Sequence, residues 1–535
     1  MNHSKMLLIT AIAVVVASCS TSKNINYNQQ LSYLTAENVP LKNGKHTEEE
    51  LLRWSHLDLV KDTIPGMSVD RAYETLLKNK KAQKVIVAVI DSGTDIQHED
   101  LQGRIWTNTK EIPGNGIDDD GNGYVDDIHG WNFLGEATHE NLEMTRILKK
   151  GDDGSEVFAK AKKAYDKKRR EALQNKMQVD FIVKADNALK EHFKKDNYDL
   201  EDVKKILTTD LELGRYKLMM MQVLGNTSKE DFDKEIEGYK DYVYDQLNYH
   251  LNLEFDGRAL VGDDPNDIND RGYGNGNVSG PVAKEAKHGT HVLGIIAQLR
   301  GNGLGGDGVA EHVEIMAIRA VPNGDEYDKD IALAIRYAVD NGAKIINGSF
   351  GKDFSPQKEW VHEAIKYAAS KDVLFVHAAG NDNKDIDVED SFPNDVVNGK
   401  EIAENFIKIG ALSYDYGTKM VASFSNYGKE NVDIFSPGDK IYATTPENTY
   451  EYQQGTSMAS PNAAGVAALI RSYYPELTAA QVKKIMMDSG ISITREVALP
   501  GEPSTKVPFA DLCKSGKIIN AYNALLMAEK VSKNK

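Results

Sequence analysis

The most regular feature of the chain is a series of short, nearly continuous apolar runs separated by amphipathic segments. Runs of this kind are typical of parallel strands covered on both faces, because both sides of each strand are then apolar. They occupy residues 84–91, 313–321, 343–351, 373–381, 406–412 and 432–438. Between them, residues 330–342 and 360–372 have helical spacing, and Gly342 ends the first of these segments as a helix C-cap would. The alternation predicts an α/β fold with a doubly wound, mostly parallel sheet.

One long block interrupts this alternation. Residues from about 141 to 256 are rich in Lys, Glu and Asp at helical spacing, which predicts a large helical insertion within the sheet domain.

The N-terminus has the pattern of an export signal. Lys5 precedes an apolar run from Met6 to Ala17 that is short for a membrane span. The ending Val16-Ala17-Ser18-Cys19 resembles the lipobox of bacterial lipoproteins, which implies cleavage before Cys19 and lipidation of its thiol. Acyl chains would then hold an exported body on a bacterial membrane, its periplasmic face or the cell surface. The alternative is ordinary signal cleavage beside a chance cysteine.

The patterns divide the chain into five parts. These are a lipoprotein signal peptide (1–18), an N-terminal extension (19–64), a sheet domain (65–142 and 258–527), the charged helical insertion (143–257) and a C-terminal tail (528–535). Cys513 is the second cysteine of the sequence, so a chain lipidated at Cys19 has no disulfide.

Composition adds two limits. With 535 residues and 41% hydrophobic content, the chain can bury one large core or two smaller ones. Its formal net charge of −17 argues against a nucleic-acid partner, because a phosphate backbone demands a basic face.

Polar residues that can carry chemistry follow the expected strands. In open α/β sheets such residues collect at the carboxyl ends of strands, which singles out Asp91, ending 84–91, and Asn381, ending 373–381. Ser457 precedes a helix rich in Ala and Gly. A serine at a helix start is ordinarily an N-cap, but its small neighbours would also let a substrate backbone come close.

His288 and His291 begin another apolar helix, in "HGTHVLG". Zinc-protease histidines stand at i and i+4 as H-E-x-x-H, whereas this pair stands at i and i+3 with Gly289 and Thr290 between. A metal pair is therefore disfavoured.

Four motifs together resemble the subtilisin-like serine proteases, the subtilases of peptidase family S8. They are "VIDSGTDIQHEDL" around Asp91, "HGTHVLG" from His288, "AAGN" ending at Asn381 and "GTSMASPNAAG" around Ser457. The resemblance covers about residues 65–142 and 258–527. It implies a serine endopeptidase that hydrolyses proteins or peptides through an acyl-enzyme.

The resemblance also implies a role for each residue. Ser457 would attack the scissile carbonyl, His288 would accept its proton, and Asp91 would hold the imidazole. Asn381 would donate to the oxyanion.

Two further segments match the family's first specificity pocket. They are Ser349, Phe350 and Gly351, and Ala378, Ala379 and Gly380. Phe350 stands where many relatives have leucine, and we expect apolar or broad preference for the residue before the scissile bond (P1).

A calcium loop is expected in "GNGIDDDGNGYVDDIHG". Positions 1, 3, 5, 7 and 9 of an EF-hand-like loop are occupied by Asp118, Asp120, Asn122, Tyr124 (by its carbonyl) and Asp126. His129 replaces the glutamate of position 12, which leaves Asp127 as a possible substitute. Relatives use Ca²⁺ for stability; the alternative is a solvated acidic turn.

Two other functions remain open, and the insertion bears on both. One is a catalytically silent lipoprotein that binds a partner through its helical insertion. The intact triad disfavours this alternative. The other is a processing protease of narrow specificity. The separation of 197 positions from Asp91 to His288 exceeds the spacing in compact members. We hypothesise that the insertion packs beside the cleft and restricts access or recruits a partner.

Overall fold

The computed structural model describes residues 39–534. The predicted signal peptide, 1–18, and the predicted lipidation site, Cys19, lie outside the described residues. Within the described range, none of the helices combines the length and the apolar character that a membrane span requires.

A nine-stranded sheet forms the centre of the molecule. Its strand order is β12-β15-β9-β8-β5-β4-β1-β3-β2, and its pairs are parallel except β12 with β15. The prediction of an α/β fold with a mostly parallel sheet is therefore confirmed. The strands are β1 (Val85–Asp91), β2 (Gly130–Asn132), β3 (Val313–Arg319), β4 (Ile345–Gly348), β5 (Leu374–Ala378), β8 (Phe406–Leu412), β9 (Ile434–Pro437), β12 (Ile491–Ser492) and β15 (Lys517–Ile518).

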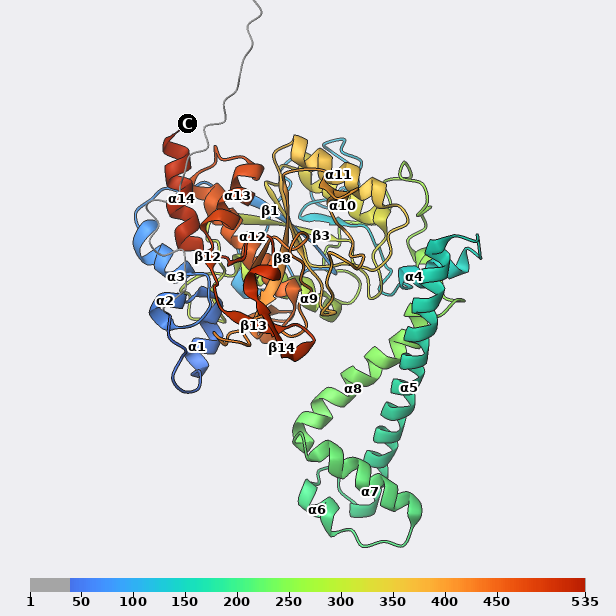
Figure 1. Cartoon of the computed structure of the whole chain (residues 1–535). Coiled ribbons are helices and arrows are strands. Elements are labelled where there is room, and N and C mark those ends of the chain that lie inside the picture. The colour runs from blue at the N-terminus through green and yellow to red at the C-terminus, as the bar shows by residue number, and fades with distance from the viewer. Residues whose placement is uncertain (1–38, 535) are drawn as a thin grey trace, which may run out of the picture.

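Helices cover both faces of this sheet, because each face is apolar and must be buried (Figure 1). One face packs on α9 (Lys287–Ala297), α12 (Thr456–Tyr473), α13 (Ala479–Ser489) and α14 (Ala521–Lys533). The other packs on α10 (Asp328–Asp340) and α11 (Lys358–Ser370).

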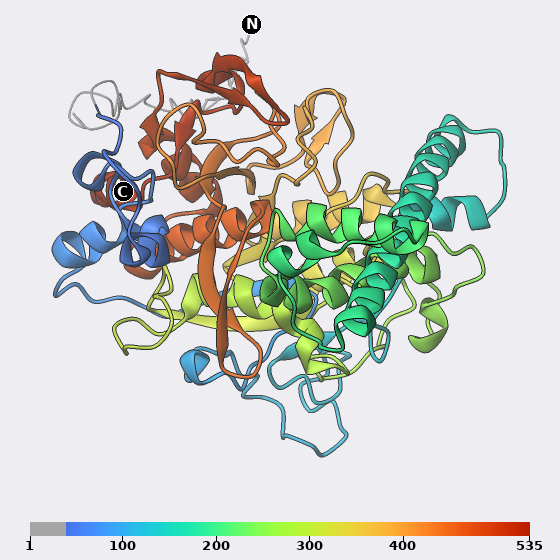
Figure 2. The same cartoon turned by 90° about the horizontal axis from the view of Figure 1, so that it is seen from below.

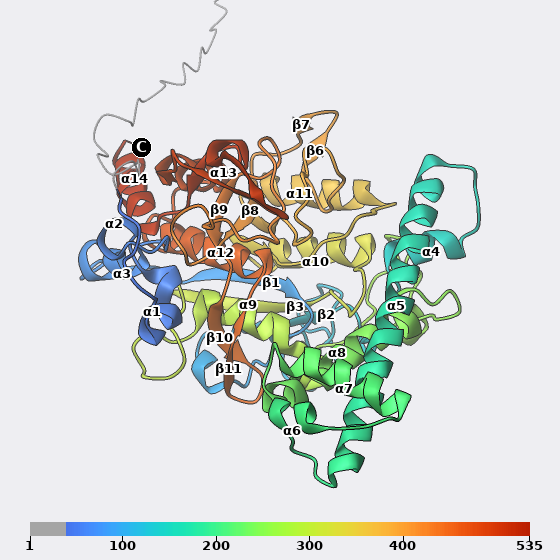
Figure 3. The ribbon, with the colours of Figure 1, turned by 60° about the horizontal axis from the view of Figure 1, so that its bottom comes forward.

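Three two-stranded hairpins complete the strands. The β10–β11 hairpin lies against α9 (Figure 3). The hairpins are β6 (Val396–Val397) with β7 (Lys400–Glu401), β10 (Ile441–Thr445) with β11 (Thr449–Gln453), and β13 (Glu496–Leu499) with β14 (Glu502–Pro508).

The insertion is helical and forms an arm that projects from the sheet body (Figure 1). Its axis is α5, a helix of 38 residues. Seen from below, α6 and α7 at the far end lie in front of the body (Figure 2). That end has its own apolar cluster, which includes Leu189, Val203 and Met220. The arm comprises α4 (Glu143–Lys149), α5 (Glu156–Phe193), α6 (Leu200–Lys205), α7 (Leu211–Leu224) and α8 (Lys229–Asp245).

The segment before β1 belongs to the main core. Trp54, only 1% exposed, and Leu59 pack in the same apolar cluster as the sheet and α12. This segment holds α1 (Glu48–Arg53), α2 (Leu59–Asp62) and α3 (Val69–Arg71). Short helical turns of 3₁₀ or π type lie at Trp54–His56, Ala72–Leu76, Glu99–Leu101, Gln246–His250, Arg258–Leu260, Ala283–Ala286 and Phe509–Asp511.

The sheet order determines which side chains meet. Strands β1, β4 and β5 are neighbours and run parallel, so the residues after them gather at one edge of the sheet. Asp91, Ser349 and Asn381 stand at that edge.

Candidate active site

Asp91 and His288 are in direct contact. His288 Nδ1 lies 2.7 Å from Asp91 Oδ1, which also accepts the Ser92 backbone N–H at 2.8 Å. Asp91 is 2% exposed. Helix α9 comes this close because Gly289 has no side chain: a Cβ there would stand 2.1 Å from the Gly93 carbonyl oxygen. The contact orients the imidazole with its Nε2 edge away from the carboxylate.

The two histidines of α9 have different environments. Burial lowers the pKa of His288, but the charge and hydrogen bond of Asp91 outweigh it, so the pKa stands above its ordinary value. His291 is fully buried, and its Nε2 bonds to the carbonyls of Ile441 and Glu451 at 3.1 and 3.0 Å. Burial lowers its pKa to about 4. His291 is therefore a neutral structural residue.

Ser457 lies in the first turn of α12, where the helix dipole favours negative charge. Pro461, inside this helix, has no N–H to donate to the Ser457 carbonyl four residues earlier. That carbonyl instead accepts the Ser349 hydroxyl at 2.9 Å, while Ser457 Oγ donates to the Ser349 carbonyl at 3.3 Å. Among the described residues, no hydrogen bond joins Ser457 Oγ to His288.

Asn381 has a fixed amide orientation. Its Oδ1 accepts the Thr456 backbone N–H at 2.8 Å and the Thr456 hydroxyl at 3.0 Å. Because a backbone N–H can only donate, the atom facing it is the amide oxygen. The Nδ2 group is thereby left free to donate on its other side.

Two further residues, Thr456 and Asn426, position the loop that bears Asn381. Thr456 is fully buried and accepts the Gly380 N–H at 3.0 Å. Asn426 donates to the Ala379 carbonyl at 2.9 Å and accepts the Asp382 N–H at 3.0 Å. Gly380 has φ +105°, and a Cβ there would come within 2.3 Å of Asn426 Nδ2. Thr456 lies within the motif around Ser457, whereas no motif marks Asn426.

A cavity of about 350 Å³ opens beside Ser457. Its walls bring together five of the six residues predicted for the specificity pocket, together with Asn381 and Thr456. Ser349 is placed behind them by its bonds to Ser457. The five are Phe350, Gly351, Ala378, Ala379 and Gly380.

The insertion contributes to the surroundings of the site on two sides. Met144 of α4 and Lys168 of α5 line the cavity beside Ser457. Asp241 and Asp245 of α8 line a second cavity, of about 680 Å³, that contains His288.

Buried ion pairs fasten the base of the arm to the sheet domain. Lys352 Nζ lies 2.9 Å from Glu143 Oε2 and 2.9 Å from Asp328 Oδ1, and donates to the Glu326 carbonyl at 2.7 Å. Although burial opposes ionisation, Arg146 and Lys352 lower the pKa of Glu143 to about 2. The first turn of the arm is therefore held at the rim of the cavity by charge.

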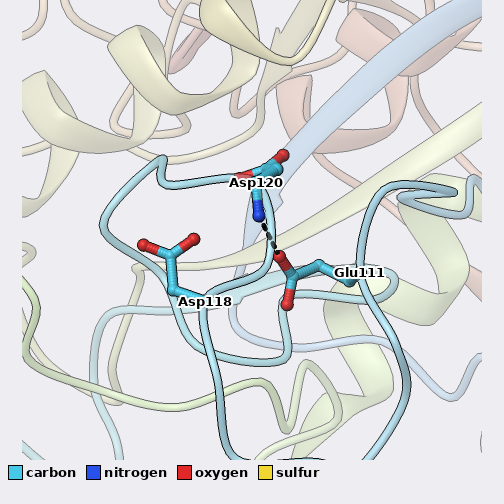
Figure 4. Close-up of side chains that lie close together, drawn as sticks. All are labelled: Glu111, Asp118 and Asp120. Atoms are coloured by element: carbon cyan, nitrogen blue, oxygen red, sulfur yellow. Dashed lines mark hydrogen bonds between the residues drawn. The ribbon is translucent and has the colours of Figure 1, made fainter.

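The acidic loop brings two of the predicted ligand residues together with a carboxylate that was not predicted. Asp118 and Asp120 lie near Glu111, with carboxylate oxygens of all three within 4.8 Å of one another (Figure 4). Glu111 Oε1 also accepts the Asp120 N–H at 3.1 Å. Asp126 accepts the N–H groups of Gly114 and Gly116, at 2.8 and 2.9 Å.

The other residues of that loop serve its internal structure. Asn122 Oδ1 accepts the Tyr124 N–H at 2.8 Å. Asp127 accepts the Tyr337 hydroxyl at 2.6 Å and the Asn122 amide at 3.0 Å. Three carboxylates of like charge this close favour a hard cation such as Ca²⁺.

The fold and site define a class. A doubly wound, mostly parallel sheet whose carboxyl edge bears an Asp–His pair, with a serine at the start of α12 and these three residues in that order along the chain, is typical of serine-type endopeptidases of the subtilisin kind. The family model described as "Subtilase family" matches residues 82–496 of this chain. This match spans most of the chain, which therefore belongs to the subtilase family of serine peptidases.

Curated relatives agree with this assignment. The chain is 42% identical over 187 residues to "Thermophilic serine proteinase" of Bacillus sp. (strain AK1), covering 35% of this chain and 42% of that one. It is 30% identical to "Subtilisin-like protease 1" of Plasmodium vivax, covering 57% and 51%. It is 35% identical to "Subtilisin DY" of Bacillus licheniformis, covering 38% and 71%. The alignments thus span about half or less of the first two relatives.

Solved structures of similar proteins include one described as "Proteases from Pseudoalteromonas arctica". It is 20% identical, with a TM-score of 0.45, over 89% of this chain and 97% of that one. A "cold adapted subtilisin-like serine proteinase" is 27% identical, with a TM-score of 0.34, over 41% and 73%.

Proposed function

We propose that this chain is an active endopeptidase that cleaves peptide bonds in proteins through Asp91, His288 and Ser457. The bond between His288 Nδ1 and Asp91 Oδ1, 2.7 Å long, carries the proposal. It fixes the tautomer in which Nε2 is the base, and it stabilises the imidazolium once His288 has taken the Ser457 proton.

The hydroxyl of Ser457 must turn before it reacts. In the free protein it donates to the Ser349 carbonyl, an acceptor that an extended substrate backbone would use. A substrate N–H bound there displaces the hydroxyl, which then turns towards His288 Nε2. The attack forms a tetrahedral intermediate whose oxyanion receives hydrogen bonds from Asn381 Nδ2 and the Ser457 N–H. His288 then passes the proton to the leaving amine, and water hydrolyses the acyl-enzyme.

The direct test measures cleavage of an unfolded protein by the appearance of new amino termini, one for each peptide bond hydrolysed. Ser457→Ala should abolish the cleavage, whereas Ser472→Ala, on the same helix but with its hydroxyl bonded to the Ala468 carbonyl at 2.7 Å, should retain it. Equal cleavage by the wild type and Ser457→Ala would overturn the proposal.

The insertion limits which substrates reach the site. Residues of the arm line both cavities. Met144 and Lys168 line the cavity beside Ser457, and Asp241 and Asp245 line the cavity that contains His288. We infer that the arm hinders the approach of a folded domain more than that of an extended chain. A variant lacking the arm should gain cleavage of a folded protein while its rate on a short peptide stays the same; an unchanged rate on the folded protein would oppose this role.

Calcium binding is proposed at the acidic loop. Glu111, Asp118 and Asp120 would supply carboxylate oxygens, and the ion would offset their mutual repulsion and hold the loop in place. The ion takes no part in the chemistry of Ser457.

Export and lipid anchoring are proposed from the N-terminal sequence alone. The run Met6–Ala17 followed by Ser18-Cys19 supports removal of the first residues and acylation of Cys19. Labelling of the membrane fraction with a palmitate analogue tests this: incorporation lost in Cys19→Ala would support the anchor, and equal incorporation by both would refute it.

A further inference from the structure

His377 is a buried polar residue that the proposed mechanism does not use. It lies on β5, is 1% exposed, and lines the cavity beside Ser457. Within residues 39–534, neither ring nitrogen has a hydrogen-bond partner. The Phe350 backbone is close enough to influence the pKa of the ring, but it does not meet hydrogen-bond geometry. A buried polar group left without a partner costs stability, and a ligand that bonds to the ring would remove that cost.

Aromatic rings hold this imidazole in place. Phe406 stacks on it at a centroid distance of 5.5 Å, and Phe350 and Phe375 meet it edge-on at 5.6 and 5.8 Å. A Cβ at Gly351 would lie 4.0 Å from His377 Cε1. The lack of a side chain at Gly351 therefore leaves the ring edge that bears both nitrogens close to the cavity.

A second buried base stands beside it. Lys408 on β8 is the registered partner of His377, so the two side chains share a face of the sheet. Lys408 is 3% exposed and donates to the Pro393 carbonyl at 3.1 Å. Among the ion pairs of the described residues none involves Lys408, although Asp395 and Asp433 act on it from a longer distance.

The pKa values agree with this shortage of nearby negative charge. Burial and then the charge of Lys408 hold the pKa of His377 well below its ordinary value. Burial lowers the pKa of Lys408 to about 8. A carboxylate arriving at His377 would meet a hydrogen-bond donor with a cation behind it.

The rim of the cavity does not supply such a carboxylate. Lys384 pairs with Asp353 at 2.7 Å, and Asp325 accepts the Glu143 N–H at 2.7 Å. Asp382 and Asp390 are exposed at the mouth. The charged side chains at the mouth are thus largely paired or solvated. The buried ring of His377, which forms the floor of the cavity, is the group that lacks a partner among the described residues.

We propose that His377 binds the side-chain carboxylate of an acidic P1 residue, so that this protease cleaves after glutamate or aspartate. The inference rests on the proposed function, because it assigns the substrate class of that same site. It replaces the expectation of an apolar or broad P1 preference with one determined by the floor of the cavity.

The test uses the purified protease and peptide p-nitroanilides that differ only at P1, carrying Glu, Gln, Leu or Lys. The wild type should prefer Glu to Leu and to Gln by roughly ten- to hundredfold in kcat/KM, the worth of a charge-assisted hydrogen bond. His377→Phe keeps the ring but removes both nitrogens and should lose this preference. The control His362→Phe, a buried histidine on α11 that bonds to Asn394 at 3.3 Å, should keep it.

Labelling of each variant with a fluorophosphonate, whose reaction with serine does not depend on P1, separates the two proposals. A labelled wild type that prefers Leu, Lys or Gln over Glu overturns the role of His377, whatever the variants do. Equal Glu preference in His377→Phe overturns it as well. A folded wild type that does not label overturns the proposed function instead.

Discussion

Ser349 and Ser457 are joined by two hydrogen bonds in opposite directions. The Ser349 hydroxyl donates to the Ser457 carbonyl at 2.9 Å, and the Ser457 hydroxyl donates to the Ser349 carbonyl at 3.3 Å. The first bond exists because Pro461 leaves that carbonyl without its helical partner. It ties the start of α12 to the end of β4, so the serine and the strand that receives the substrate keep a fixed separation. The second bond is longer, and in the proposed mechanism a bound substrate replaces it.

Thr456 positions the amide of Asn381. Thr456→Val keeps the shape but removes the hydroxyl that joins Gly380 N–H to Asn381 Oδ1, so Asn381 Nδ2 loses its aim at the oxyanion. We expect kcat to fall by roughly tenfold, as for loss of one hydrogen bond, with KM nearly unchanged. Thr456→Ser should retain most of the rate. Steady-state kinetics of all three proteins decide the point, and a change confined to KM would contradict the assignment.

Asn381 itself should matter more than Thr456. Asn381→Leu removes a donor that acts on the transition state, and the typical loss for one oxyanion donor is ~10²–10³ in kcat. The exposed Asn383, two residues further along the chain, provides the control Asn383→Leu, for which kcat should stay within about twofold. A loss of less than tenfold in Asn381→Leu would place the oxyanion elsewhere.

The pH profile of kcat/KM reports His288. Its neutral form is the base, and its pKa stands above the ordinary 6.5, so activity should fall as pH drops through a value above 6.5. Asp91→Asn removes the charge that raises this pKa while burial still lowers it; the acid limb should move to lower pH, and kcat should fall by ~10⁴. An acid limb in the same place for both proteins would contradict this account.

Calcium should stabilise the fold through the acidic loop. At a calcium concentration about a hundred times Kd, the stabilisation is ~2.7 kcal/mol, and a chelator should lower Tm by a few degrees. Glu111→Gln should abolish this difference between calcium and chelator. Asp267→Asn, in the separate exposed loop 262–270, should leave it intact. The same calcium-dependent shift in Glu111→Gln would exclude this site.

Removal of one partner from the buried ion pairs at the base of the arm should strongly destabilise the fold. Lys352→Met leaves Glu143 and Asp328 without their shared cation in a buried place, and we expect a loss of ~3–5 kcal/mol in the free energy of unfolding. Lys366→Met, which breaks an exposed pair with Glu363, should change it by less than about 1 kcal/mol. Urea denaturation measures the free energy of unfolding of both variants. Similar losses in the two would contradict a stabilising role for the buried ion pairs of Lys352.

The sequence predicted the central sheet well, because its strands are long and apolar on both faces. The run 406–412 matches β8 residue for residue, and 84–91 exceeds β1 by one residue. The two-residue strands β12 and β15 have too few positions to show a period. Residues 39–64 gave no strand pattern, yet Trp54 packs in the main core.

At the site, the predicted residues are those with motifs around them, and the others act through distant contacts. Glu111 reaches Asp120 only after the turn at 113–117 brings the chain back. Thr456 and Asn426 act through backbone groups of the loop after β5. His377 falls within an apolar run, where the pattern alone suggests a strand residue and not a ligand.

Asp91, His288 and Ser457 are proposed to work together as one nucleophilic site. The most direct measurement is labelling of the folded wild type with a fluorophosphonate, with the modified residue identified by mass spectrometry. We predict labelling on Ser457, slower at acid pH and absent in Ser457→Ala and His288→Ala. Labelling at another serine, or equal labelling of Ser457 when His288 is alanine, would contradict it.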